Sequence, residues 1–284
     1  MIVLGLDTAT PATAVGLRLA DGTTLRAHDQ PEAGERPGHT SQSLTLASEL
    51  LAQAGIGWSA LERIAVGVGP GTFTGLRVGI ATARGLAQSL GIEVVGVSSL
   101  RVLAEAALRE ADSRTRGVLA AIDARRGEAF AAAYDAQGEL APPRALPPED
   151  LAALPGNLED RSREARAYGA GRFGDASGAS VSPIGPRFAP RDWWAVGDGA
   201  LRFRGYLEAI AVAVPVDTSP LHRVDAGVLC ELALSAPAGD PEAVLPDYCR
   251  RPDAEIALEG GAAGRQVGEP GSSIFQSSKT GSQK

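Results

Sequence analysis

A glycine-rich stretch with the sequence GVGPGTFTGLRVG runs from Gly67 to Gly79 and leads into a helical pattern. Such a corner can bind phosphate, because the first backbone N–H groups of a helix have no partner within the helix. A phosphate-binding loop of the P-loop type also requires a lysine, and the segment Gly69–Gly75 contains none. We therefore exclude a P-loop at this corner.

Two other glycine motifs fail on spacing. A dinucleotide-binding fingerprint would need glycine at Thr72 or Thr74, and a nucleophile elbow would need serine at Phe73. Two interpretations of the corner remain open. Either its backbone binds an anion near Gly69 and Gly71, or the glycines only allow tight turning and close packing of the helix that follows.

Two aspartates, Asp7 and Asp123, each end a predicted strand and precede a predicted turn. In two-lobed nucleotide-binding folds, carboxylates at such positions can hold a metal-bound phosphate or act as a base. Aspartate is also a common turn former. Both interpretations stay open, so Asp7, its neighbour Thr8 and Asp123 are candidate contacts for an anion or a nucleotide.

The histidines and cysteines predict neither a metal site nor a nucleophile. His28, His39 and His222 are not spaced as metal ligands, since no second histidine follows one helical turn after another. We expect surface positions for His28 and His222. Cys230 and Cys249 are too few for a disulfide framework or a structural zinc site, so we expect free thiols and no bound metal.

The composition predicts a two-lobed cytoplasmic protein that does not bind nucleic acid by itself. The chain has 284 residues, enough for two domains, and only 5% of them are aromatic. A formal charge of −7 opposes unaided binding to a polyanion. The N-terminal residues lack a signal-peptide pattern, and the apolar runs are shorter than a membrane span, so we expect no membrane contact.

The first predicted lobe, residues 1–104, begins with a meander and continues with a β-α-β unit. The segments IVLGLD, AVGLRLADG and TTLRAHD predict three antiparallel strands joined by turns. ERIAVGVGPG and GIEVVGVSSL predict two further strands. A helix from Leu100 to Glu110 leads into the second lobe.

Two longer helices are predicted in this lobe, from His39 to about Gly55 and from about Thr74 to Leu90. The apolar positions of the first span an arc of about 160° at 100° per residue, wider than packing on one core requires. The first helix could therefore serve two surfaces. The small residues of the second would let another helix approach closely: Gly79, Ala81, Ala83, Gly85 and Ala87.

The second predicted lobe, residues 105–251, repeats the outline of the first. A strand ends in Asp123, a tight turn follows at Arg126 and Gly127, and a second strand runs to Tyr134. A proline-rich loop with one short helix near residues 148–154 comes next. The duplicated strand-Asp-turn-strand unit predicts an α/β fold with a duplicated mixed sheet flanked by helices.

The end of the chain adds three predicted segments. WWAVGDGA predicts a strand followed by a turn at Gly197-Asp198-Gly199. A helix from Arg223 to Ala236 could complete the first lobe. Residues 252–284 have a high content of Gly, Ser and Gln and no apolar pattern, so we expect a disordered tail.

Seven segments between Met1 and about Arg251 occur in a specific order: MIVLGLDTAT, GHTSQSL, GVGPGTFTGLRVGIATARGLA, GVSSL, VLAAIDARRGEAF, VGDGA and PDYCRR. Together they resemble the TsaB (YeaZ) family of bacterial tRNA threonylcarbamoyladenosine biosynthesis proteins. The resemblance implies the two-lobed fold of actin, sugar kinases and heat-shock chaperones (ASKHA), in agreement with the duplicated unit. It also implies a role in making threonylcarbamoyladenosine beside the anticodon of tRNAs that read codons starting with A.

The resemblance further implies that this chain is a pseudo-enzyme. In the pathway the transferase is a paralogue, TsaD, and TsaB-type proteins are its required noncatalytic partners. The paralogue holds a metal with an H-x-x-x-H pair, and the matching positions here are Ser99 and Leu103, which cannot replace imidazole. We expect no cofactor on this chain, with ATP and metal on partner subunits. The implied partners are TsaD and the ATPase TsaE, with tRNA reached only through the complex.

The resemblance also implies where the partner binds. In the family, helices matching His39–Ala54 and Thr74–Leu90 form a bundle with the partner's equivalents, and the same helices would join a homodimer of the free chain. The expected interface residues are His39, Leu44, Leu46, Ala47, Leu50, Leu51, Leu76, Ile80, Ala83 and Ala87. Two alternatives stay open: an ASKHA-type small-molecule kinase or ATPase that uses Asp7 and Asp123, and, less favoured, a metallopeptidase-like protein.

Overall fold

The computed structural model describes residues 1–32, 35–151, 154, 192–237 and 239–249. Contacts group Met1–Cys249 into one compact unit, and the other unit is Arg250–Lys284. All residues of that second unit lie outside the described part. The predicted tail at residues 252–284 therefore also lies outside the described residues.

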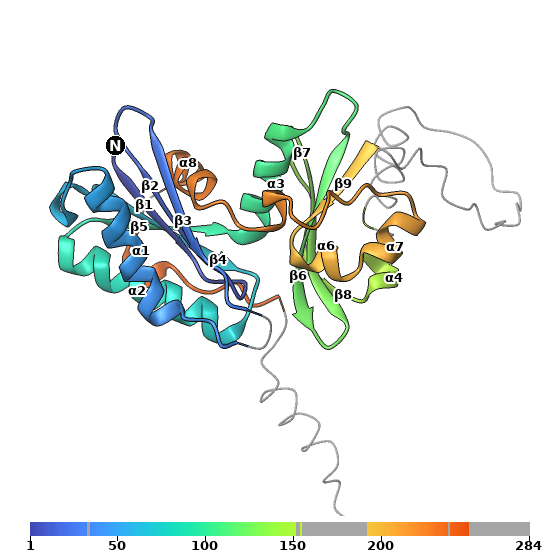
Figure 1. Cartoon of the computed structure of the whole chain (residues 1–284), viewed down its shortest axis with the longest axis horizontal. Helices are drawn as coiled ribbons and strands as arrows, with labels where there is room; N and C mark the ends of the chain where they lie inside the picture. Colours follow the sequence, from blue (N-terminus) through green and yellow to red (C-terminus); the bar gives the residue numbers. More distant parts are fainter. Residues whose placement is uncertain (33–34, 152–153, 155–191, 238, 250–284) are drawn as a thin grey trace, which may run out of the picture. The chain divides into compact units, whose positions relative to one another are not determined.

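The first sheet contains β1 (Val3–Asp7), β2 (Thr13–Arg18), β3 (Thr24–Asp29), β4 (Arg63–Gly69) and β5 (Glu93–Ser98). Its strand order is β3-β2-β1-β4-β5 (Figure 1). β2 pairs antiparallel with β1 and β3, whereas β4 pairs parallel with β1 and β5. The predicted meander and β-α-β unit are therefore confirmed.

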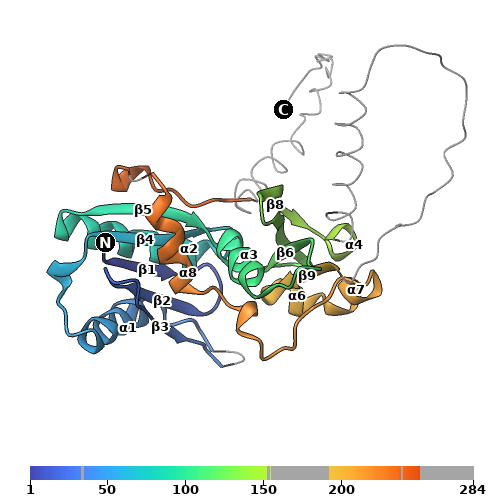
Figure 2. The same cartoon turned by 90° about the horizontal axis from the view of Figure 1, so that it is seen from above.

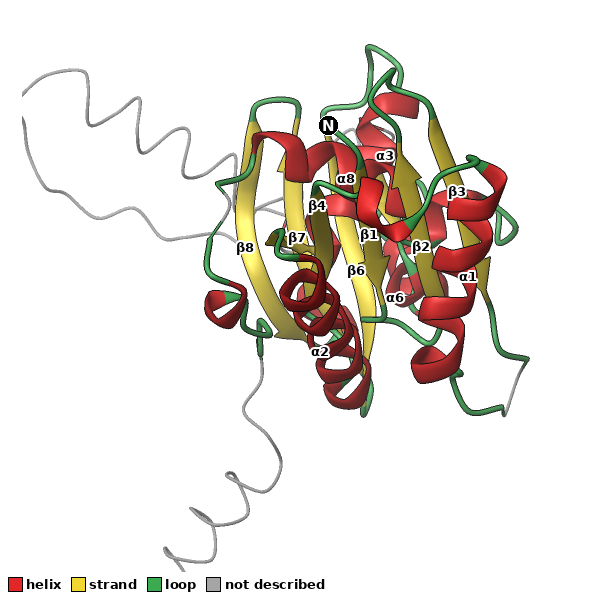
Figure 3. Cartoon of the chain, turned by 90° about the vertical axis from the view of Figure 1, so that its left-hand side faces the viewer, coloured by secondary structure: helices red, strands yellow, loops and turns green. Residues whose placement is uncertain are grey.

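Helices cover both faces of this sheet: α1 (His39–Gln53) and α2 (Phe73–Leu90) on one, and α3 (Ser99–Glu110) and α8 (Ala226–Ser235) on the other. Leu4 and Leu6 join the core under α1 and α2, whereas Val3 joins the core under α3 and α8, because successive strand side chains point to opposite faces. Figure 3 shows α1 and α2 in front of the strands, and Figure 2 shows α8 crossing β1 and β2. None of the described helices has the length and apolar character needed to span a membrane.

The second sheet contains β6 (Gly117–Arg125), β7 (Glu128–Asp135), β8 (Gly138–Leu146) and β9 (Trp193–Val196). The order is β8-β7-β6-β9, with β9 parallel to β6 and the other pairs antiparallel. One face packs against the layer of α3 and α8, and the other carries α4 (Pro148–Leu151), α6 (Asp198–Arg202) and α7 (Arg204–Ala209). Three short 3-10 turns complete the described elements: η1 (Trp58–Ala60), η3 (Pro220–His222) and η4 (Pro241–Ala243). Two mixed sheets flanked by helices confirm the predicted α/β fold with a duplicated mixed sheet.

Three predicted segments differ in the structure. The start of the proline-rich loop is strand β8, which tolerates Pro142 and Pro143 because it lies at the sheet edge and its pairing with β7 is irregular there. The predicted turn after β9 is the first turn of α6, which begins at Asp198. α8 begins at Ala226 rather than Arg223, because the Asp225 side chain accepts hydrogen bonds from the first backbone N–H groups and caps the helix.

Candidate functional site

The glycine-rich corner packs against the turn that follows β1. β4 ends at Gly69, whose φ of +102° is one that side chains rarely allow. Thr72 caps α2, because its Oγ1 accepts a 3.3 Å hydrogen bond from the Gly75 N–H. The Thr72 N–H donates to the Ala9 carbonyl at 2.8 Å, and the Thr8 hydroxyl donates to the Gly75 carbonyl at 2.7 Å. Polar groups at the start of α2 are therefore hydrogen-bonded to the β1–β2 turn.

The glycines of this corner are needed because α2 and the turn lie too close together for side chains. A Cβ at Gly71 would lie 2.3 Å from the Ala9 carbonyl oxygen, and one at Gly75 would lie 2.0 Å from the Thr8 carbonyl oxygen. At Gly79 it would lie 2.3 Å from Thr8 Oγ1. The geometry therefore favours close packing over an anion site. For Gly79, it also corrects the expected approach of another helix, since the neighbour is this chain's own turn.

Asp7, at the end of β1, is only 1% exposed. Its Oδ2 accepts a 2.6 Å hydrogen bond from the Ser99 hydroxyl, and its Oδ1 accepts a 2.9 Å bond from the Ala9 N–H. Burial raises the pKa of the Asp7 carboxyl, although both hydrogen bonds lower it. A Cβ at Gly67 would lie 1.8 Å from Oδ2, so β4 leaves room for this carboxyl only because it has glycine there. Asp7, like the equally buried Thr8, belongs to internal packing.

Asp123, at the end of β6, is bound by arginines. Arg202 Nη1 donates to its two carboxylate oxygens at 2.7 and 3.0 Å, and Arg125 Nη1 lies 3.3 Å from Oδ2. The Asp123 N–H donates to Asp198 Oδ1 at 3.0 Å, and burial raises the pKa of the Asp198 carboxyl. Asp7 and Asp123 therefore have separate sets of partners. The sequence did not predict the contributions of Arg202 and Asp198; the only signal was an acidic residue inside the VGDGA motif.

His222 corrects one expectation about the histidines. It is 5% exposed, with Nδ1 3.2 Å from the Gly197 carbonyl oxygen and Nε2 3.1 Å from the Pro215 carbonyl oxygen. The predicted surface position of His222 was wrong, because η3 folds inward against the end of β9. His28 is exposed, as predicted.

The cysteines are free thiols, as predicted. Burial raises the pKa of both Cys230 and Cys249 to about 12, so neither forms an appreciable thiolate at neutral pH. Among the described residues, no three His, Cys, Asp or Glu side chains are grouped so that they could hold a metal ion.

Most of the expected partner residues are buried where α1 and α2 pack on the first sheet. Eight of the ten are at most 6% exposed: His39, Ala47, Leu50, Leu51, Leu76, Ile80, Ala83 and Ala87. Leu44 is 42% exposed, and Leu46 is half-buried against the core. These eight side chains pack within this chain, so Leu44 and Leu46 are the expected interface residues with accessible apolar surface, and the interface itself stays a prediction. His39 instead joins α1 to β2, with Nδ1 2.8 Å from Thr13 Oγ1.

An exposed aromatic cluster at the start of α2 was not predicted. The ring of Phe73, which is 44% exposed, stacks on Tyr248 with centroids 5.6 Å apart. The Arg77 guanidinium lies 3.6 Å from the Phe73 centroid, and its Nε donates to the Tyr248 hydroxyl at 3.0 Å. Tyr248 belongs to the PDYCRR segment, so the resemblance marked the residue without showing its contact with α2.

Comparisons with known proteins agree on one family. The family model described as "TsaD: tRNA N6-adenosine threonylcarbamoyltransferase" matches residues 30–258. The chain is 42% identical over 134 residues to the tRNA threonylcarbamoyladenosine biosynthesis protein TsaB of Escherichia coli, and 39% identical over 132 residues to that of Haemophilus influenzae. The matches cover 47% and 46% of this chain and 55% and 52% of those proteins, so the chain spans about half the length of these relatives.

Solved structures extend the similarity over more of the chain. The structure of YeaZ from Pseudomonas aeruginosa has a TM-score of 0.61 and 29% sequence identity, and covers 87% of this chain and 100% of its own. Another structure is described as similar to peptidase YeaZ from Pseudomonas aeruginosa. It has a TM-score of 0.62 and 30% sequence identity, and covers 88% of this chain and 99% of its own. The chain belongs to the TsaD family and is, within it, a homologue of TsaB, also called YeaZ.

Proposed function

We propose that this chain is a noncatalytic subunit in tRNA threonylcarbamoyladenosine synthesis, which pairs with TsaD and activates it. The observation that carries the proposal is the hydrogen bond from Ser99 to Asp7. Ser99 matches the first metal-binding histidine expected in the paralogue, yet its hydroxyl donates a hydrogen bond to a buried carboxyl. Leu103, at the second matching position, is 1% exposed within the core. Both positions serve packing here, which supports a scaffold rather than a transferase.

The proposed partner surface consists of the exposed faces of α1 and α2. Leu44 is the exposed large apolar residue of α1, and Ala81 is exposed on α2. A Cβ at Gly85 would meet nothing within 4 Å, so this part of α2 is open. Small residues on a helix face allow a second helix to approach closely. In the absence of TsaD, we propose that the same faces join two copies of this chain.

The other subunits supply the remaining functions in this proposal. TsaD carries the metal and the transfer chemistry, and TsaE supplies the ATPase. tRNA is reached through the complex, because the formal charge of −7 opposes binding by this chain alone. The assembly works in the bacterial cytoplasm.

Reconstitution with purified TsaD and TsaE from the same organism tests the proposal. The chain alone should neither modify tRNA nor bind a divalent metal tightly, and adding TsaD should give a complex that co-elutes in gel filtration. Modification of tRNA by the isolated chain would overturn the noncatalytic role.

Introducing negative charges on the surface tests the partner surface separately. The double substitution Leu44→Glu and Ala81→Glu should abolish co-elution with TsaD, because both positions are exposed on the proposed face. Tyr206→Glu is the matched control, because Tyr206 is 57% exposed on α7 and lies outside that face. If the folded double variant still co-elutes, the proposed surface is wrong.

The enzyme alternatives have direct tests. The burial of Asp7 and the arginine partners of Asp123 do not favour a kinase or an ATPase. We therefore expect no tight binding of ATP and magnesium to the isolated chain by calorimetry, whereas tight binding would favour that alternative. A casein cleavage assay with a metal-free control tests the peptidase.

A further inference from the structure

The aromatic cluster at the start of α2, made of Phe73, Arg77 and Tyr248, continues the proposed partner surface. The exposed residues of α2 include four that follow one another at a spacing of four: Phe73, Arg77, Ala81 and Gly85. Residues four apart in a helix form one row of its surface. The cluster therefore extends the row that contains Ala81 and Gly85 to the first residue of α2.

A strap formed by residues 239–249 brings Tyr248 to this row. The strap follows α8 and runs beside β5, where Gly239 and Val94 form an antiparallel bridge (Figure 2). Val244 of the strap packs on the same core as α1 and α2. α1 packs on β2 and β3, at the other end of the sheet from β5. α2 therefore lies between α1 on one flank and the strap on the other.

The two arginines of α2 make different contacts with the strap. Arg84 Nη2 donates to the Val244 carbonyl at 2.7 Å and so fastens the strap to the helix. Arg77 uses only its Nε, in the 3.0 Å hydrogen bond to the Tyr248 hydroxyl. The Arg77 guanidinium carbon lies 3.6 Å from the centroid of the Phe73 ring. Arg77 is therefore held in place by the aromatic cluster without using its terminal nitrogens.

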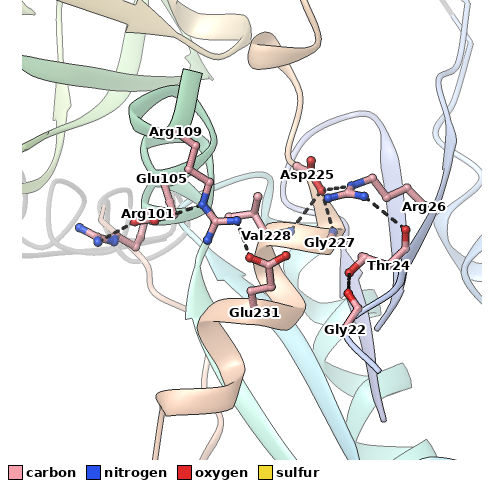
Figure 4. A network of polar contacts seen from close by, with 10 residues as sticks. All are labelled: Gly22, Thr24, Arg26, Arg101, Glu105, Arg109, Asp225, Gly227, Val228 and Glu231. Carbon is pink, nitrogen blue, oxygen red and sulfur yellow. Dashed lines mark hydrogen bonds and ion pairs between the residues drawn. The ribbon is translucent and has the colours of Figure 1, made fainter. Parts of the chain in front are cut away.

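The charge of Arg77 is not neutralised by a carboxylate. Figure 4 shows the opposite situation in another region, where Arg26 pairs with Asp225 and Arg109 pairs with Glu231. Within the part of the chain that the structure describes, no carboxylate forms an ion pair with Arg77, and its Nη1 and Nη2 groups donate no hydrogen bond. A guanidinium that is already held in place loses less rotamer freedom when it binds a partner.

The helices around Arg77 carry little other charge. The charged residues of α1 and α2 are Glu49, Arg77 and Arg84, whereas 21% of the whole chain is charged. The centres of protein interfaces are depleted of charge and enriched in aromatic residues and arginine, which also dominate binding hot spots. Binding to the phosphate backbone of RNA needs several lysines or arginines instead. The composition of this face therefore fits a protein partner.

We propose that the aromatic cluster and the strap extend the TsaD-binding surface, and that Arg77 Nη1 and Nη2 bind a carboxylate of TsaD there. The guanidinium fork matches the two oxygens of a carboxylate. Phe73 and Tyr248, which are 44% and 38% exposed, supply aromatic surface beside it. The inference rests on the proposed pairing with TsaD, and adds the strap and one charged contact to that surface.

The affinity of the full chain for TsaD from the same organism, measured by calorimetry, tests the cluster. Arg77→Gln and Phe73→Ala should each raise the Kd about tenfold or more, because each removes a central contact. Arg144→Gln and Tyr206→Ala are the matched controls, since both side chains are exposed and lie outside α1, α2 and the strap. Thermal unfolding checks that every variant is folded. Wild-type affinity in both cluster variants would overturn the inference.

The salt dependence of binding tests the carboxylate contact. Wild-type binding to TsaD should weaken as NaCl is raised from about 0.05 to 0.5 M, because salt screens the attraction between charges. Binding by Arg77→Gln should weaken less, since the variant lacks the charge that the carboxylate would meet. Equal salt dependence in the two proteins would show that Arg77 does not bind a carboxylate of TsaD.

The same measurements separate this inference from the proposed function. If the wild type does not bind TsaD, the proposed function fails, and the inference fails with it. If the wild type binds and the Leu44→Glu, Ala81→Glu double variant does not, normal binding by both cluster variants would overturn only the inference. An effect of the cluster variants confined to self-association of the chain, measured by analytical ultracentrifugation, would assign the cluster to a second copy and overturn the proposal. An effect confined to tRNA capture by the complex would assign it to RNA and overturn it as well.

Discussion

The hydroxyl of Ser99 donates a 2.6 Å hydrogen bond to the carboxylate of Asp7, which is 1% exposed. This bond joins the end of β1 to the first turn of α3. Ser99→Ala should lower the free energy of unfolding by about 1–3 kcal/mol, because it leaves a buried acceptor without one of its partners. Urea unfolding measures the loss. Ser48→Ala, at an exposed position of α1, should change stability by less than about 0.5 kcal/mol, and equal losses in both variants would contradict the prediction.

The raised pKa of Asp7 predicts a pH dependence of stability. Because burial raises the pKa of this carboxyl above 3.8 in the folded state, the folded state binds more protons than the unfolded state just above that pH. Asp7 therefore lowers stability progressively as pH rises from about 3.8 through the folded-state pKa. Asp7→Asn removes this titration, so the stability of the variant relative to the wild type should increase with pH over that window. Urea unfolding from pH 4 to pH 7 checks this, and a constant difference would show that the carboxyl is not perturbed.

Substitutions of two glycines in α2 provide a matched comparison. Gly75→Ala would place a Cβ 2.0 Å from the Thr8 carbonyl oxygen, whereas a Cβ at Gly85 meets nothing within 4 Å. Gly75→Ala should destabilise by about 2–3 kcal/mol through overpacking. Gly85→Ala should stabilise by about 0.5–1 kcal/mol, because alanine is the better helix former. Thermal unfolding compares the two, and similar effects would mean that α2 does not lie against the β1–β2 turn.

His39 predicts a second pH effect, with the opposite sign. Burial lowers the pKa of His39, so the unfolded state binds more protons than the folded state below about pH 6.5. The contribution of His39 to stability should be complete above that pH and should fall as pH drops through it. The wild type should therefore lose stability relative to His39→Asn between pH 7.5 and pH 5.5. His28→Asn, at an exposed position, should follow the wild type in a thermal unfolding series.

Substitution of Asp123 tests whether its carboxylate has a structural or a catalytic role. Arg202 donates to both of its oxygens, so its contacts serve the junction of β6 and α6. Asp123→Asn should leave tRNA modification by the reconstituted complex near the wild-type rate, with a small loss of thermal stability. Loss of modification in a variant that folds and still binds TsaD would assign Asp123 a direct part in the chemistry.

The sequence predicted the elements and their order, because local patterns set them. The apolar run IVLGLD marked the first strand, and the duplicated strand-Asp-turn-strand unit marked two related sheets. The absence of lysine and of suitable glycine spacing was sufficient to exclude the familiar phosphate loops. Edge strand β8 was missed, because proline signals a loop unless the strand is known to lie at an edge.

The tertiary structure decided which side chains face inward and which contacts they make. Leu44 and Leu50 look alike in the sequence, yet one is 42% exposed and the other 3%, because the direction in which α1 lies on the sheet is not encoded in its own periodicity. The partner of Asp7 lies 92 residues away at Ser99, and no local pattern joins them. The glycines of GVGPGTFTGLRVG were visible in the sequence. Only the fold shows that they allow close packing against this chain's own β1–β2 turn.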